Sequence, residues 1–229
     1  PRFGETAMAA TDLSPPAARR TRRARFRVGG STRAMRIKEW QLLRRDPWLV
    51  SQTLTQLLYL APPALLLSRN FGERTGALAV AVMVLVTVGG QLAGALAWLA
   101  ISGEDAPDLV ATAPVSPAAV THAKVEAVFA AVAIVLGPLL IGLVFLSVEH
   151  AVVAAIAMAC AAASTVRIQL WFRAQAKRSH FRRRHTSSRI ATFGEALVSF
   201  SWAAAAGLML AGSLLAAFSV AIAFVILGA

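Results

Sequence analysis

The chain has 229 residues, of which 57% are hydrophobic, and it carries a formal net charge of +12 at pH 7. Soluble domains contain about 45–50% apolar residues, so this composition excludes an ordinary soluble domain and favours one bundle of membrane helices. Nearly all Lys and Arg residues lie before Trp48 or between Arg167 and Arg189, beside apolar stretches. Such flanking charge is typical of membrane topology signals and lacks the interleaved aromatic residues of a nucleic-acid site, so we expect no nucleic-acid partner.

Residues 1–34 are rich in Arg, Ala, Pro and Gly and show no apolar period. A segment with so little apolar surface cannot form a core, so we predict a disordered basic arm on the cytoplasmic side. Residues 35–229 are predicted to form one transmembrane domain. The chain begins at Pro1 and not at Met, from which we expect a processed protein or a piece of a longer one.

A short amphipathic segment, residues 35–46, precedes the first apolar stretch. Ile37, Trp40 and Leu43 recur at spacing three, which is typical of one face of a helix, and Trp favours the membrane interface. Pro47 then ends the helix or turns the chain into the bilayer. The residues assigned to this interfacial helix are Lys38, Glu39, Trp40, Arg44, Arg45 and Trp48.

Six apolar stretches follow, and they predict an all-α fold, a polytopic membrane bundle of about six transmembrane helices. Their approximate ranges are 48–68, 76–101, 118–148, 151–172, 191–211 and 213–229. The last two are short for a full crossing, which implies tilted helices or a thinned bilayer.

Local signals add detail to these spans. Gly90 and Gly94 form a GxxxG pattern, which lets two helices approach closely. Ser116 before Pro117 predicts the start of the third span, with Ser as the N-cap and Pro as the first helical residue. Glu149-His150 predicts the tight turn between the third and fourth spans.

Alternation of the spans fixes an orientation. The N-terminal arm, the break after the second span and the segment 167–189 fall on one side, and a side rich in Arg is cytoplasmic. We therefore predict a multi-pass protein of the bacterial plasma (inner) membrane with both termini in the cytoplasm. The tract Arg173–Arg189 is interpreted first as a topology determinant, and second as a contact for anionic lipids or for an acidic protein face.

The break between the second and third spans, residues 102–116, is acidic although it lies on the basic side. It contains Glu104, Asp105 and Asp108 and no Lys or Arg. Helix capping accounts for part of this, because Ser102 can cap a short helix whose first turn carries two of the acids near the positive end of the dipole. Asp108 lies beyond that turn, and capping leaves it unexplained.

The order of these elements resembles the membrane-spanning permease of type-2 ABC exporters. The shared order is an amphipathic helix, two spans, a short cytoplasmic helix of the form Ser-x-Glu…Leu…Pro-Val-Ser, and a long helix that re-enters the membrane. The resemblance implies that the short helix is a coupling helix, which contacts a separate ATPase. The residues assigned to this contact are Ser102, Glu104, Asp105, Asp108, Leu109, Pro114, Val115 and Ser116.

The same resemblance implies the partners. An ABC ATPase subunit would bind ATP and Mg, while this chain would bind no cofactor and would not itself be an enzyme. In agreement, the sequence has no G-x-x-x-x-G-K-[ST] phosphate loop. A six-span unit of this family is expected to pair with a second permease half or a second copy of itself. The interfacial segment is also similar to the middle of longer two-half permeases, which makes the C-terminal half of such a protein one interpretation.

Glu195 is the candidate for an ionisable residue within the membrane. It lies near the start of the fifth span, where Arg189 or Arg167 could pair with it, and we weigh structural pairing above transport chemistry. The four His residues and Cys160 are scattered along the chain. The sequence therefore predicts no metal site and no catalytic set of residues.

A second class of function stays open, a non-transporting scaffold or assembly subunit of a larger membrane complex. Its basis is the small-residue helix faces, which suit tight packing. These faces are Gly90 with Gly94, and Ala203 with Gly207 and Ala211. An ATPase partner separates the two classes, because a permease needs one and a scaffold does not.

Overall fold

The computed structural model describes residues 31–45, 74–102, 115–172 and 189–228, together with Ser51, Thr55 and Leu58. All regular structure within these ranges is helical. Ser31–Ala229 forms one compact unit. The predicted disordered arm lies outside the described residues, except for its last four positions, which belong to the first helix.

Four of the described helices are long and apolar enough to cross a membrane. The shortest has 22 residues, which at about 1.5 Å per residue reach about 33 Å, more than the hydrocarbon core of about 30 Å. An all-helical membrane bundle is therefore the fold of the described part of the chain. The four helices are α4 (Arg74–Ser102), α6 (Pro117–Leu146), α7 (Val148–Trp171) and α8 (Arg189–Leu210).

Within the described residues, fewer helices are long enough for a crossing than the sequence predicts for the whole chain. Of the expected span 48–68 only Ser51, Thr55 and Leu58 are described, each of them helical, so this span stays a prediction. α9 (Leu215–Gly228) has 14 residues, which reach about 21 Å and fall short of the hydrocarbon core. The structure thus supports four of the six predicted spans.

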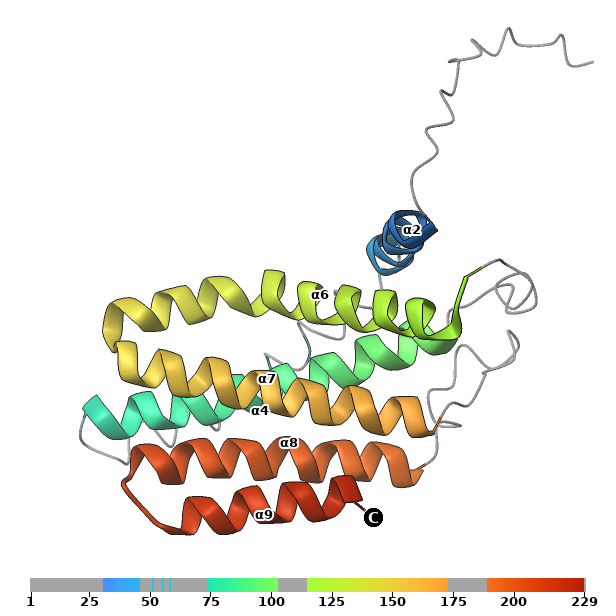
Figure 1. Cartoon of the computed structure of the whole chain (residues 1–229). Coiled ribbons are helices and arrows are strands. Elements are labelled where there is room, and N and C mark those ends of the chain that lie inside the picture. Colours follow the sequence, from blue (N-terminus) through green and yellow to red (C-terminus); the bar gives the residue numbers. More distant parts are fainter. Residues whose placement is uncertain are drawn as a thin grey trace, which may run out of the picture. The chain divides into compact units, whose positions relative to one another are not determined.

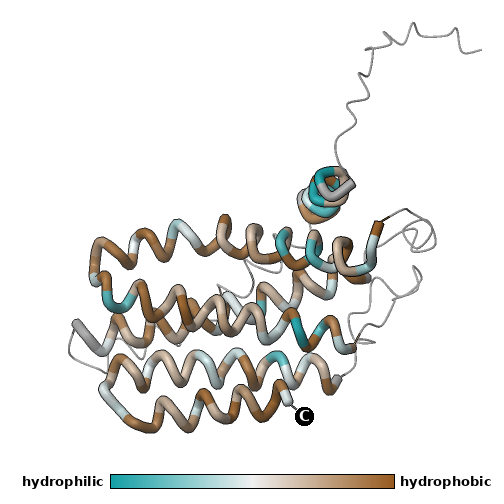
Figure 2. Tube along the Cα trace, in the orientation of Figure 1, coloured by the Kyte–Doolittle hydropathy of each residue, from teal (hydrophilic) through white to brown (hydrophobic). Residues whose placement is uncertain are grey.

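The long helices are arranged in two layers (Figure 1). α6, α7, α8 and α9 lie side by side in chain order, and α4 packs behind them against α6, α7 and α8. The half of α4 that leads to Ser102 is enclosed, because every residue from Leu92 to Ala100 is buried. Figure 2 shows that the long helices are predominantly hydrophobic, whereas the first helix is largely hydrophilic.

Short turns reverse the chain between neighbouring helices. Ser147 alone separates α6 from α7, and its Oγ accepts a hydrogen bond from the backbone N–H of His150 at 3.5 Å. This turn lies two residues before the predicted one, because Glu149 and His150 already belong to the first turn of α7. The turn from α8 to α9 contains Gly212 with a φ of +68°, a backbone conformation that glycine adopts without strain.

These reversals bring four helix ends together. The end of α7 lies beside the start of α6, and contacts described below place the end of α4 and the start of α8 with them. We call this the basic end of the bundle, because the Arg-rich segment 173–188 joins it. It is formed by Ser102, Pro117, Trp171 and Arg189.

The first helix, α2 (Ser31–Arg45), packs against α6 and α4 at the basic end. It begins four residues before the predicted interfacial helix. Among its described side chains, Glu39 and Leu43 are buried, whereas Ile37 is 49% exposed and Trp40 is 38% exposed. Of the apolar stripe inferred from Ile37, Trp40 and Leu43, Leu43 packs against the bundle and the other two do not, so the packed face of α2 combines Leu43 with the charged contact of Glu39.

Candidate functional site

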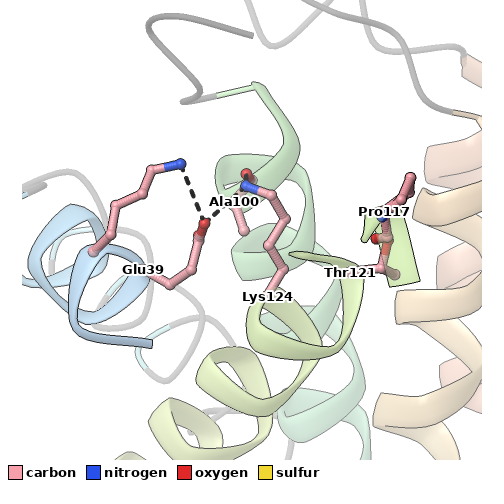
Figure 3. Close-up of polar contacts among 6 residues, drawn as sticks. Glu39, Ala100, Pro117, Thr121 and Lys124 are labelled. Carbon is pink, nitrogen blue, oxygen red and sulfur yellow. Dashed lines mark hydrogen bonds and ion pairs between the residues drawn. The ribbon is translucent and has the colours of Figure 1, made fainter. Parts of the chain in front are cut away.

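A buried charge contact joins α2, α4 and α6 at the basic end (Figure 3). The Oε1 atom of Glu39 lies 3.1 Å from Nζ of Lys124 on α6 and 3.6 Å from Nζ of Lys38. Nζ of Lys124 also donates a hydrogen bond to the carbonyl oxygen of Ala100, near the end of α4. One ammonium group therefore holds acceptors from two other helices.

The carboxylate of Glu39 is held by charge attraction. Its side chain is 1% exposed and that of Lys124 is 13% exposed, so water screens this pair only weakly. Neither carboxylate oxygen has hydrogen-bond geometry with a described residue, although the distance to Lys124 is that of an ion pair. A buried charge is stable only when an opposite charge lies close to it, and Lys124 and Lys38 meet this need.

A second, exposed pair spans the same joint. Nε of Arg36 on α2 lies 2.8 Å from Oε2 of Glu126 on α6, and the two side chains are 58% and 50% exposed. Exposed pairs contribute about 0–1 kcal/mol to stability. Arg36 and Glu126 therefore add little energy, but they match the charges of the two helices at a second point.

A separate buried polar contact joins α7 and α8. The side-chain amide of Gln169 donates a hydrogen bond to Oε1 of Glu195, and both residues are buried. A Cβ atom at Gly94 of α4 would lie 2.7 Å from Oε2 of Glu195. The missing side chain at Gly94 thus makes room for the carboxylate between three helices.

α4 also packs closely against α7 and α8 further towards the middle of the bundle. A Cβ atom at Gly90 would lie 2.4 Å from Oγ of Ser199 on α8 and 3.2 Å from Cβ of Ala161 on α7. The close approach predicted from the GxxxG pattern is confirmed, and it occurs within this chain. On the same two helices, Nε1 of Trp202 donates a hydrogen bond to Oγ of Ser164 at 3.0 Å.

The acidic segment that was assigned to ATPase contact lies mostly outside the described residues. This applies to Glu104, Asp105, Asp108, Leu109 and Pro114. Its flanks are described: Ser102 is the last residue of α4, and Val115 and Ser116 precede α6.

The flank on the α6 side has the predicted geometry. The Oγ atom of Ser116 accepts a hydrogen bond from the N–H of Ala119 at 3.3 Å, and Pro117 occupies the first turn. The predicted start of the third span is confirmed. Both flanks of the acidic segment lie at the basic end.

The remaining predicted residues are placed only in part. Lys38, Glu39 and Trp40 lie on α2, while Arg44 and Arg45 form its last turn with side chains outside the described set. Trp48 is also outside it. Arg189 begins α8, but its side chain is not among those described, so its pairing with Glu195 stays a prediction. Arg167 is exposed, and its guanidinium carbon lies 4.9 Å from the ring centroid of Trp171.

Lys124 and Gln169 make contacts between helices that the sequence did not predict. A lysine followed two positions later by Glu126 in an otherwise apolar helix was a usable signal, because such charges need partners. Gln169 offered no comparable signal, since its role depends on a carboxylate from another helix.

The contacts at the basic end hold helix ends in fixed relative positions. Among the described residues, no three His, Cys, Asp or Glu side chains gather where they could hold a metal ion. The described contacts at this end are ion pairs and hydrogen bonds between helices. Comparisons of the chain with protein-family models, with curated proteins and with solved structures find no match.

Proposed function

We propose that the chain is the transmembrane permease subunit of an ABC-type exporter, driven by a separate ATPase that contacts residues 102–116. The observation that supports this most strongly is the position of the flanks of that segment. Ser102 ends α4 and Ser116 caps α6 at the basic end, so the acids between them leave and rejoin the bundle on the side that carries α2. A partner bound there would contact both long helices at their ends.

The two helices that flank the segment suit mechanical input. α4 has 29 residues and α6 has 30, and each is continuous over about 44 Å. A displacement applied at the basic end would be transmitted along these continuous helices towards the opposite side of the membrane, and Pro138 inside α6 marks a point where that helix can bend. α4 would carry it to the interior of the bundle and α6 to its periphery.

Charge supports a protein partner for the segment in preference to the membrane surface. Glu104, Asp105 and Asp108 are acids on a side that otherwise carries the Arg-rich segments, and anionic lipid headgroups repel acids. A basic patch on an ATPase would attract them and would orient the encounter. In this proposal the ATPase binds ATP and Mg, and the basic end faces the cytoplasm of a bacterial cell.

The outer helices fit a lipid environment. Large apolar side chains on α6 and around the turn to α9 point outward, among them Phe145 at 85% exposure and Leu214 at 95%. Such surfaces are stable in hydrocarbon or against a second permease half. Both surroundings agree with a subunit that completes a transport path by pairing.

Substitution of Glu104 by Lys tests the proposal. We expect Glu104→Lys to insert and purify normally but to lose the co-purifying ATP-hydrolysing activity by at least tenfold, because it places a like charge against the basic partner. Glu149→Lys, at the opposite end of α7 and exposed, is the matched control and should retain that activity. Full activity with Glu104→Lys would rule out this mode of coupling.

The scaffold interpretation has lost part of its basis. Gly90 and Gly94 pack against α7 and α8, and a Cβ at Gly207 would lie 2.5 Å from Sδ of Met83 on α4. Gly90, Gly94 and Gly207 therefore serve packing inside the chain, whereas Ala211 at the end of the second small-residue face is exposed. A scaffold would still form a tight complex with membrane proteins without any ATPase, which a pull-down in mild detergent distinguishes.

A further inference from the structure

α2 is attached to the bundle through few side chains. Among its described residues only Glu39 and Leu43 are buried, and Leu42 is partly buried against the core. Helices that stay docked through packing normally bury an apolar stripe over several turns. Since one of the two buried side chains is a carboxylate, the attachment of α2 depends on charge to an unusual degree.

The charges that face each other across the joint are matched at two points. On α2, Arg36 is followed one turn later by Glu39, and on α6 they meet Glu126 and Lys124. A reversed or shifted α2 would bring like charges together. Matched pairs of this kind set the register of one element on another.

The buried inner pair, Glu39 with Lys124, contributes more to the docking of α2 than the exposed outer pair, Arg36 with Glu126. Glu39 and Lys124 are 1% and 13% exposed, whereas Arg36 and Glu126 are 58% and 50% exposed. Removal of Lys124 leaves the buried carboxylate of Glu39 with Lys38, which is more distant at 3.6 Å and more exposed at 34%, while loss of an exposed pair is compensated by water. Substitutions in the inner pair should therefore weaken the docking of α2, whereas substitutions in the outer pair should have little effect.

We propose that Glu39 and Lys124 form a charge clasp that keeps α2 docked, and that α2 leaves the bundle as a unit when the clasp opens. Each charge retains a neighbour after separation, which lowers the free-energy cost of the opening. Lys38 stays beside Glu39 on α2, and the Ala100 carbonyl stays with Lys124 on the bundle. The four long helices keep their own contacts and stay packed. This inference goes beyond the transport proposal and does not depend on it.

The test measures how well Leu43 is shielded. Leu43 is 5% exposed, so a Leu43→Cys probe reacts slowly with a small maleimide while α2 is docked. Cys160→Ala removes the other thiol. In the full-length protein in mild detergent, we expect Lys124→Met to raise the labelling rate of Leu43→Cys at least tenfold. Glu39→Gln should raise it by a smaller factor, because the charge left behind, on Lys124, keeps its hydrogen bond to the Ala100 carbonyl and is less buried than Glu39.

Two further variants distinguish the effect of the positive charge of Lys124 from a general effect of substitution at this contact. Lys124→Arg keeps the positive charge and should restore slow labelling, whereas Glu126→Gln, which removes only the exposed pair, should change the rate less than twofold. A monodisperse elution profile for every variant shows that the bundle is folded. If Lys124→Met expresses poorly, recovery of yield by Lys124→Arg but not by Lys124→Gln gives the same answer. Equal protection of Leu43→Cys in all variants, or a Lys124→Arg protein that labels as fast as Lys124→Met, would overturn the proposal.

Discussion

The side-chain amide of Gln169 on α7 donates a hydrogen bond to the carboxylate of Glu195 on α8, and the two residues are 4% and 2% exposed. Gln169 lies two residues before the end of α7, so the contact belongs to the basic end of the bundle. Gly94 of α4 borders the same carboxylate. Glu195 therefore lies between α4, α7 and α8 and links α7 to α8 through a hydrogen bond.

A structural role for Glu195 predicts which substitutions are tolerated. Glu195→Gln keeps a carbonyl oxygen in place to accept from Gln169, and we expect it to change the free energy of unfolding by less than about 1 kcal/mol. Glu195→Ala leaves the buried amide of Gln169 without this acceptor, which costs about 1–3 kcal/mol. Denaturation in mild detergent, followed by Trp fluorescence, measures both.

The control for this pair is Thr192→Ala, an exposed position on the same helix, which should leave stability unchanged. The same variants separate structure from transport chemistry. If Glu195→Gln is as stable as the parent but abolishes transport in reconstituted vesicles, Glu195 acts as an ionisable group and not only as a joint.

The glycines of α4 make a second prediction. Gly90→Ala would push a methyl group into Ser199 and Ala161, and overpacking of this kind costs about 1–3 kcal/mol. Gly142→Ala is the matched control, because nothing lies within 4 Å of a Cβ at that position of α6 and Ala favours helix by up to about 1 kcal/mol. We expect the first variant to lower the unfolding midpoint and the second to keep or raise it. Equal effects of the two would mean that α4 does not approach α7 and α8 as closely as described.

The N-cap of α6 makes a third prediction. Ser116→Ala removes the acceptor for the N–H of Ala119, which should cost about 1 kcal/mol and speed hydrogen exchange at Ala119. Ser116→Asp keeps an acceptor and should keep the slow exchange. The cap also fixes where the acidic segment joins α6, so a Ser116→Ala protein with unchanged exchange would indicate that α6 starts elsewhere.

Much of the fold follows from the sequence because the bilayer dictates it. A crossing needs about 20 apolar residues in a row, and such runs have visible ends. The predicted limits of α4, α6, α7 and α8 lie within three residues of those in the structure. α9 shows the limit of this reasoning, because its residues are apolar enough for a span and yet form only 14 residues of helix.

The contacts between helices were much harder to predict. The period of α2 indicates a helix, but its buried face depends on Lys124, which lies far along the chain, so the local pattern of α2 does not show which face packs. The GxxxG pattern indicated close packing without naming Ser199 or Ala161 as the neighbours. The hydrogen bond between Glu195 and Gln169 likewise requires two helices that only the fold brings together.

Orientation makes the last prediction, and it bears on the fold and the function together. In a Cys160→Ala background, Ser116→Cys and Glu149→Cys mark opposite ends of α6 and α7, which are separated by about 45 Å. We expect an impermeant maleimide to reach Ser116→Cys, and likewise Asp108→Cys, only in inside-out vesicles, and Glu149→Cys only in right-side-out ones. The Arg-rich segments should keep the basic end in the cytoplasm, because translocating them would work against the bias that sets topology. If Asp108→Cys were labelled only from the outer face, no cytoplasmic ATPase could contact it, and the orientation and the proposed coupling would fail for the same reason.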